Sequence, residues 1–260
     1  MSRRPAAAPV QAYVLHRYDW SESSLILELF TRERGRVAVV AKGAKRPYSQ
    51  LRPVLLPFQR LNALLGRPPG DESAELLTLR SAEWAGGVPT VAGAALFSGF
   101  YLNELLLKLL ARQDPHAALF DAYAGTLPTL GGDESAASAA ALRAFELVLL
   151  RETGVLPALD ALTQSQLPVR PEAHHTLHAE AGVTERGADT GLPGRMLQAL
   201  ESALAAGDLA ALQRACLTAP VALRHQLRAL LQYHLGSVNL RTRQLMLDLQ
   251  RLTPPDRDPR

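Results

Sequence analysis

The segment 32–52 collects basic side chains at short intervals. They are Arg32, Arg34, Arg36, Lys42, Lys45, Arg46 and Arg52. No Asp or Glu occurs between Glu33 and Asp71, so these like charges repel one another. Their clustering therefore does not stabilise the fold. Dispersed Lys and Arg side chains neutralise phosphate groups, and an exposed ring beside them can stack on a base. Tyr48, in a polar loop, is the ring best placed for stacking, whereas Phe58, flanked by leucines, is expected in the core.

The sequence carries no motif for catalysis or for nucleotide binding. It contains no Walker loop, no G-x-G-x-x-G after a predicted strand and no G-x-S-x-G. Acidic residues are scattered singly, so neither a Mg²⁺ cluster nor a nuclease is indicated. Cys216 lies in an amphipathic pattern typical of a buried, inert thiol. His174, His175 and His178 have no cysteine or organised acid beside them, and we interpret them as incidental surface histidines. We expect a binding protein with no enzymatic activity, cofactor or metal.

Positive charge is concentrated at one end of the chain. Residues 1–70 contain 12 Lys/Arg and 4 Asp/Glu, a net +8, and the remainder contains 16 Lys/Arg and 21 Asp/Glu, a net −5. This asymmetry indicates a polyanionic partner for the basic segment. The alternative to nucleic acid is a basic adaptor that binds acidic proteins or anionic membrane surfaces. Its membrane form would need a basic amphipathic helix, whereas these cations fall on predicted strands and loops.

Nothing in the sequence predicts secretion or a membrane span. No apolar segment follows Arg3 and Arg4, and no window approaches about 18 uninterrupted apolar residues. The single cysteine cannot form an internal disulfide. We expect a cytoplasmic protein whose residues 1–9 form a disordered tail.

Short strand patterns fill the N-terminal part of the chain. They span residues 11–17, 23–31, 36–42, 52–66 and 73–85. Gly35 closes the hairpin loop 32–35 at a position that needs a positive φ. Five strands in so short a segment favour a small closed barrel over a sandwich. The sequence therefore predicts a barrel over residues 10–85 that carries the cations.

Helical patterns follow the barrel. They span residues 91–111, 114–127, 133–154, 193–207, 208–219, 220–236 and 240–252. In the second helix, Asp114 is the expected N-cap and Pro115 the first helical residue. The segment at about 155–192, rich in Pro and Gly, is expected to be an irregular excursion. The sequence thus predicts an α+β protein with a helical domain over residues 86–260.

A series of short motifs resembles the RecO family of bacterial recombination mediators. The motifs are Ser21–Ser24, Phe30–Thr31, Gly35–Arg36, Ala41–Ala44, Ser49–Arg52, Leu56–Phe58, Leu79–Glu83, Phe97–Leu110 and Leu142–Leu150. They stand in the family's order, and the resemblance covers about two thirds of the chain. It implies a five-stranded OB-fold followed by an α-helical domain.

The resemblance also implies a function in DNA repair and recombination. Proteins of this kind bind single- and double-stranded DNA and anneal complementary strands coated with single-strand-binding protein. With RecR they assist the loading of RecA. The resemblance therefore implies a non-enzymatic cytoplasmic protein that is associated with the nucleoid.

One residue of the helical domain acquires a role through the resemblance. In this family the acidic, Phe-ended C-terminal tail of single-strand-binding protein docks beside the arginine that matches Arg143, and Leu142 and Leu147 would line the slot. From the residues alone, the alternative is a solvated Arg143 paired with Glu146 at i+3. The resemblance favours docking.

The sequence departs from the family pattern in two places. Many relatives carry a four-cysteine zinc site where Leu156–Leu192 contains no cysteine, so we expect no zinc. The family's Leu-Gly-x-Lys-Pro-Leu-Lys-Ser-Arg sequence is replaced by Leu235–Arg243, which lacks the Lys-Pro pair. A contact that depends on that pair is not expected here.

Overall fold

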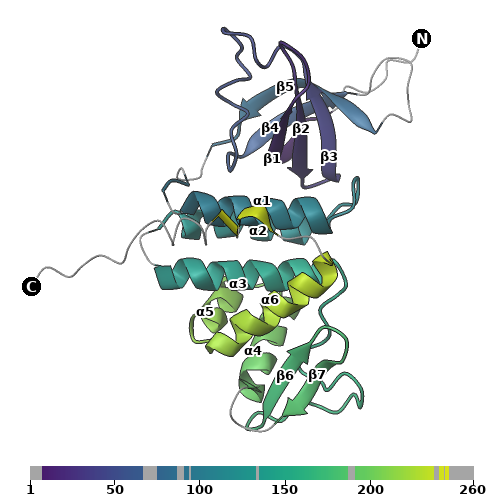
Figure 1. Cartoon of the computed structure of the whole chain (residues 1–260), viewed down its shortest axis with the longest axis vertical. Coiled ribbons are helices and arrows are strands. Elements are labelled where there is room, and N and C mark those ends of the chain that lie inside the picture. Colours follow the sequence, from purple (N-terminus) through teal and green to yellow (C-terminus); the bar gives the residue numbers. More distant parts are fainter. Residues whose placement is uncertain are drawn as a thin grey trace, which may run out of the picture.

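A barrel, a stack of helices and a small sheet follow one another along the length of the molecule (Figure 1). This computed structural model describes residues 8–66, 75–86, 91–93, 95–132, 135–186, 191–236, 240–242 and 244–245. The predicted tail lies almost wholly outside the described residues. The predicted last helix is described only in part, and the described parts of it are helical at 241–242 and 244–245. The α+β class with an N-terminal barrel is confirmed.

Five strands close into the predicted barrel. They are β1 (Val10–Asp19), β2 (Leu25–Thr31), β3 (Gly35–Ala41), β4 (Leu61–Gly66) and β5 (Leu76–Trp84). Their order around the barrel is β1-β2-β3-β5-β4, with β3 and β5 parallel and the other pairs antiparallel, as in the Greek-key OB-fold. Alternate residues such as Val14, Leu27 and Leu29 point inward and form the barrel core, as the period-two pattern predicts.

The fourth strand is shorter than predicted. It begins at Leu61 rather than at Arg52, and residues 51–60 form turns and an irregular segment. Pro53 and Pro57 cannot donate to a strand ladder, and Phe58 has a φ of 65°, which ends extended backbone. Phe58 is buried, as predicted, and its ring stacks edge-to-face on Phe100 at a centroid distance of 5.0 Å.

Six helices follow the barrel in the part of the chain that the structure describes. They are α1 (Ala95–Leu109), α2 (Ala117–Leu130), α3 (Ser135–Glu152), α4 (Gly194–Ala205), α5 (Leu209–Leu217) and α6 (Val221–Leu235). Figure 1 shows α1 and α2 directly beneath the barrel and α3 beneath them. The predicted N-cap of the second helix is wrong, because α2 begins at Ala117. The residues before it are held on the barrel instead, where Gln113 N–H donates to the Arg36 carbonyl.

The predicted irregular segment contains a sheet. β6 (His174–His178) pairs with β7 (Gly182–Arg186) and with β8 (Leu192–Pro193), and all pairs are antiparallel. The prediction failed because His175 and Thr176 of β6 are buried polar residues, which breaks the expected alternation of apolar and polar side chains. The sheet contacts α6, where Gln226 Oε1 accepts from Leu177 N–H at 2.9 Å.

Aromatic side chains join the barrel to the helices. Tyr13 and Phe30 are fully buried on the outer wall of the barrel and pack against Phe120 and Tyr123 of α2, with ring centroids 4.9–6.2 Å apart. Asn103 of α1 donates to a β1 carbonyl and accepts from the Tyr123 hydroxyl at 2.6 Å. Packed rings and the two hydrogen bonds of Asn103 fix the barrel on the helical domain.

Substitution of Gly35 tests how closely the β2–β3 hairpin approaches the segment between α1 and α2. Gly35 has the predicted positive φ, 62°, and a Cβ there would lie 1.8 Å from the Asp114 carbonyl oxygen. Gly35→Ala should therefore lower the free energy of unfolding by about 3 kcal/mol or more, because left-handed strain and the clash add. Gly207→Ala is the matched control, since Gly207 has a φ of 64° and nothing within 4 Å of its Cβ position. We expect about 1–2 kcal/mol there in urea unfolding. Equal losses would contradict the close contact.

Candidate nucleic-acid interface

The barrel divides the predicted cations between its two ends. The β2–β3 hairpin end, where Thr31 pairs with Gly35, faces the helices, and the end where Leu25 pairs with Ala41 faces away from them. Arg32, Arg34 and Arg36 lie at the hairpin end. Lys42, Lys45, Arg46, Tyr48 and Arg52 lie beyond β3, in the loop that leaves the opposite end, which we call the free end.

Two of the three hairpin arginines contact the helical domain. Arg32 forms a bidentate ion pair with Asp121 of α2, at 3.0 and 2.8 Å. Arg36 donates to the Leu107 carbonyl of α1 at 2.8 Å, and its guanidinium lies 3.9 Å from the buried Glu28 carboxylate. Glu28 also pairs with Arg112 of the α1–α2 linker. Arg34 is exposed at the tip of the hairpin. The charges of Arg32 and Arg36 therefore serve the barrel–helix contact.

The free end keeps its cations exposed. Within the described part of the chain, no carboxylate pairs with Lys42, Arg46 or Arg52. Lys45 Nζ lies 3.0 Å from both the Ser21 carbonyl and an Asp19 carboxylate oxygen. The loop is nevertheless anchored, because it inserts apolar side chains into the barrel core. These are Ala44 and Leu55, both buried. The backbone that carries the cations is thus held in place by the barrel core.

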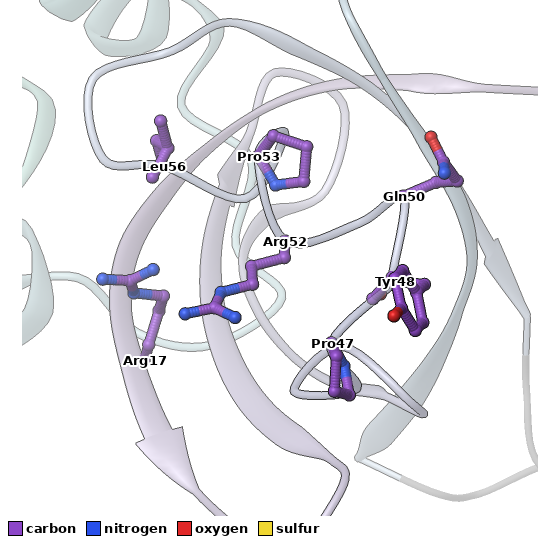
Figure 2. A pocket seen from close by; sticks show the side chains of 8 residues that line it. Arg17, Pro47, Tyr48, Gln50, Arg52, Pro53 and Leu56 are labelled. Carbon is purple, nitrogen blue, oxygen red and sulfur yellow. The ribbon is translucent and has the colours of Figure 1, made fainter.

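A groove of about 570 Å³ opens beside this loop (Figure 2). Its lining residues are Arg17, Pro47, Tyr48, Ser49, Gln50, Arg52, Pro53 and Leu56. Tyr48 is 94% exposed. Figure 2 shows the guanidinium groups of Arg17 and Arg52 turned toward one space. The groove therefore combines two cations, an open ring and apolar walls.

Sequence reasoning missed Arg17. A bulge between Val14 and His16 shifts the register of β1, so that Arg17 lies opposite Leu27. Directly paired residues share a face of the sheet, and Leu27 points into the barrel. Arg17 therefore lies over the barrel mouth, where its guanidinium reaches the Leu55 carbonyl at 3.5 Å. The sequence of β1 carries no recognisable signal of this bulge.

Two further rings at the free end were missed. Trp20, in the β1–β2 loop, is 61% exposed, and Tyr18 at the end of β1 is half exposed. Because Asp19 pairs with Leu25, this loop leaves the barrel at the same end as the basic loop. The sequence does carry a signal for these exposed rings. Tyr18 and Trp20 flank the charged Asp19 and are not part of an apolar segment, which is typical of surface positions.

Arg143 lies on α3 in a partly buried network. Its guanidinium contacts Glu146 Oε1 at 2.5 Å, and the Tyr101 hydroxyl donates to the same oxygen at 2.7 Å. Burial, reinforced by the Glu146 carboxylate, holds the pKa of Tyr101 well above its usual value. Leu142 is half-buried. Leu147 is fully buried, so its side chain packs in the core and does not line an open slot.

The segment 209–247 is positive, although the helical domain as a whole is not. No Asp or Glu occurs from residue 209 to residue 247, and Arg224 and Arg228 lie exposed on α6. The charge of Arg228 acts on Tyr101, where it opposes the rise of the tyrosine pKa, and this places Arg228 near the same network. This segment thus supplies positive charge to a domain whose net charge is negative.

The described residues contain no group of three or more His, Cys, Asp or Glu side chains that could hold a metal ion. The interpretation of all three histidines as surface residues is wrong for His175, which is buried, and burial lowers its pKa. Cys216 is buried as predicted, and burial raises the pKa of its thiol to about 12. No helix in the described part of the chain is long and apolar enough to cross a membrane.

Comparison with known proteins identifies the family. Residues 8–88 match the family model for the recombination protein O N terminal, and residues 92–244 match that for the recombination protein O C terminal. The chain belongs to the RecO family of DNA repair proteins. The DNA repair protein RecO of Polaromonas sp. JS666 is 55% identical over 246 residues, which cover 93% of this chain and 96% of the relative. That of Verminephrobacter eiseniae is 52% identical over 255 residues, covering 97% and 100%. RecO proteins are mediators and not enzymes.

The residues of this RecO chain do not fit the zinc site implied for many relatives. The segment between α3 and α4 has no cysteine, and its sheet is held by other contacts. Val169, Leu177, Val183 and Leu192 are buried in it, and Thr163 Oγ1 accepts from Val183 N–H at 2.8 Å. Apolar packing thus takes the place that thiolate ligation would hold.

We therefore expect purified protein to contain far less than one zinc per chain, because a structural zinc site needs about four Cys or His ligands. Elemental analysis after dialysis checks this, with a known zinc protein as the reference. About one zinc per chain that resists a chelator would contradict it.

Proposed function

We propose that this protein is a non-enzymatic recombination mediator that binds single- and double-stranded DNA through the free end of its barrel. The observation that carries the proposal is the set of exposed cations at that end, opposite the end that contacts the helices. The set comprises Arg17, Lys42, Lys45, Arg46 and Arg52. Arg32 and Arg36 of the predicted set act instead at the barrel–helix contact, and Arg34 lies away from the free end.

Phosphate contact by dispersed cations carries no base code, so binding should show little sequence preference. The second candidate, an adaptor for anionic membranes, is favoured less. The cations stand on loops and a strand, whereas membrane-surface proteins use a basic amphipathic helix. The exposed rings Tyr48 and Trp20 among the cations offer surfaces on which bases can stack.

A salt titration of oligonucleotide binding measures the number of phosphates contacted. If about five phosphates are neutralised, log K should fall with log salt at a slope near −3.5 on single strands and −4.5 on duplex. The full chain should be used, because the barrel buries Tyr13 and Phe30 against the helices. Replacing Lys45, Arg46 and Arg52 by Ala should weaken binding to all sequences and reduce the single-strand slope to about −1.4.

The matched control replaces three exposed arginines of the helical domain, Arg170, Arg195 and Arg214, by Ala. It changes the net charge equally and should leave the slope near that of the wild type. A flat salt response of the wild type would refute phosphate-driven binding. The same slope for both triple variants would place the DNA elsewhere.

We further propose that the protein anneals strands coated with single-strand-binding protein and, with RecR, assists RecA loading at the nucleoid in the cytoplasm. Family membership supports this part. Docking of the acidic tail of single-strand-binding protein has support from the helical domain. Arg143 is a cation at the edge of an apolar core beside the half-buried Leu142, and the positive charge of Arg228 acts on the same network. An acidic peptide that ends in Phe suits this combination.

Arg143→Ala should separate tail binding from DNA binding. The lost charge-assisted hydrogen bond is worth about 1.5–3 kcal/mol, so affinity for a tail peptide should fall about ten- to a hundredfold. Affinity for naked DNA should stay near that of the wild type, because Arg143 lies on α3, away from the free end. Fluorescence anisotropy measures both.

Two variants control this experiment. Glu146→Gln keeps a partner for the Tyr101 hydroxyl but removes the charge that competes for Arg143, so it should bind the peptide at least as well as the wild type. Arg195→Ala removes an exposed arginine of α4 and should change nothing. Equal peptide affinity of wild type and Arg143→Ala would show that Arg143 only pairs with Glu146.

A further inference from the structure

Two arginines from distant parts of the barrel share the groove at the free end. Arg17 comes from β1 and Arg52 from the loop before β4, and Figure 2 shows their guanidinium groups turned toward one space. The lining residues that the structure describes include no acid. Two guanidinium groups without a carboxylate repel each other, and an anion between them removes this cost. A phosphate group suits the planar fork of each guanidinium.

The remaining walls of the groove suit a base. The Tyr48 ring is almost wholly exposed, and Pro47, Pro53 and Leu56 add apolar surface to the groove. The volume of about 570 Å³ is in the range of small-ligand sites. Burial of Leu55 in the barrel holds the loop in place, so the ring and the cations need little ordering before a ligand binds.

We propose that this groove is a subsite for one unpaired nucleotide, whose base stacks on Tyr48 while its phosphate lies between Arg17 and Arg52. Both faces of a base inside a duplex are covered by its neighbours, so only a single strand or an opened end can fill the subsite. The groove thus gives the barrel a preference for unpaired DNA that phosphate contacts alone do not supply. This inference rests on the proposed DNA binding by the same end of the barrel.

Three DNA probes test the subsite with the full chain. They are an oligo(dT) of about 12 nucleotides, an abasic strand of the same length, and a blunt-ended duplex with G·C pairs at both ends. Tyr48→Ala should lower the affinity for oligo(dT) about fivefold or more, and leave the affinities for the abasic strand and the duplex within about twofold. Tyr48→Phe keeps the ring and should restore binding. Arg17→Ala should reduce the single-strand salt slope by about 0.7.

Tyr233→Ala, at an exposed tyrosine of α6, is the matched control and should bind all three probes as the wild type does. If Tyr48→Ala binds oligo(dT) as the wild type does, while the wild type shows salt-dependent binding, the subsite is refuted and the proposed DNA binding stands. If the wild type binds none of the probes, the proposed function fails and the subsite with it. An equal loss on oligo(dT) and on the abasic strand would also refute stacking.

Discussion

The packing of the barrel wall on α1 and α2 is the contact on which the rest of the structure depends. Tyr13 and Phe30 point out of the barrel and would be exposed without the rings of Phe120 and Tyr123. Such rings bury a large apolar area and pack in only a few geometries, so they fix the orientation as well as supplying stability. Asn103 strengthens this, because its amide satisfies buried polar groups of both domains.

A fixed orientation gives the two ends of the barrel different roles. At the hairpin end, Arg32 and Arg36 donate to acceptors of the helical domain, and the guanidinium groups of Arg36 and Arg112 compensate the buried charge of Glu28. At the free end, Lys42, Arg46 and Arg52 have no carboxylate partner among the described residues and remain open to solvent. The clustering of like charges in the sequence therefore has one explanation in the structure, interdomain pairing at the hairpin end, and one that we propose, an anionic ligand at the free end. The proposed tail site around Arg143 lies in the other domain, so the proposal allows both partners to be bound at once.

The sequence revealed the barrel and most of the helices, because period-two and period-3.6 patterns and the turn at Gly35 depend on local residues. It also revealed the cations and Tyr48. It could not divide the cations between two ends, since that depends on which loop meets α2. Arg17 was missed because a bulge shifts the register of β1 and places it over the barrel mouth, and the sheet of β6–β8 was missed because His175 is polar and buried. These failures share one cause, which is that tertiary contacts override the local pattern.

Hydrogen exchange of the full chain with and without a short single strand tests the central claim most directly, because it reports on both ends of the barrel in one experiment. The account predicts slower amide exchange in residues 42–56 and in the β1–β2 loop when DNA is bound. It predicts no change in the α1–α2 linker, whose amides already contact the barrel at the Arg36 carbonyl. Protection of the linker and of the hairpin 32–34, with none in residues 42–56, would contradict the account.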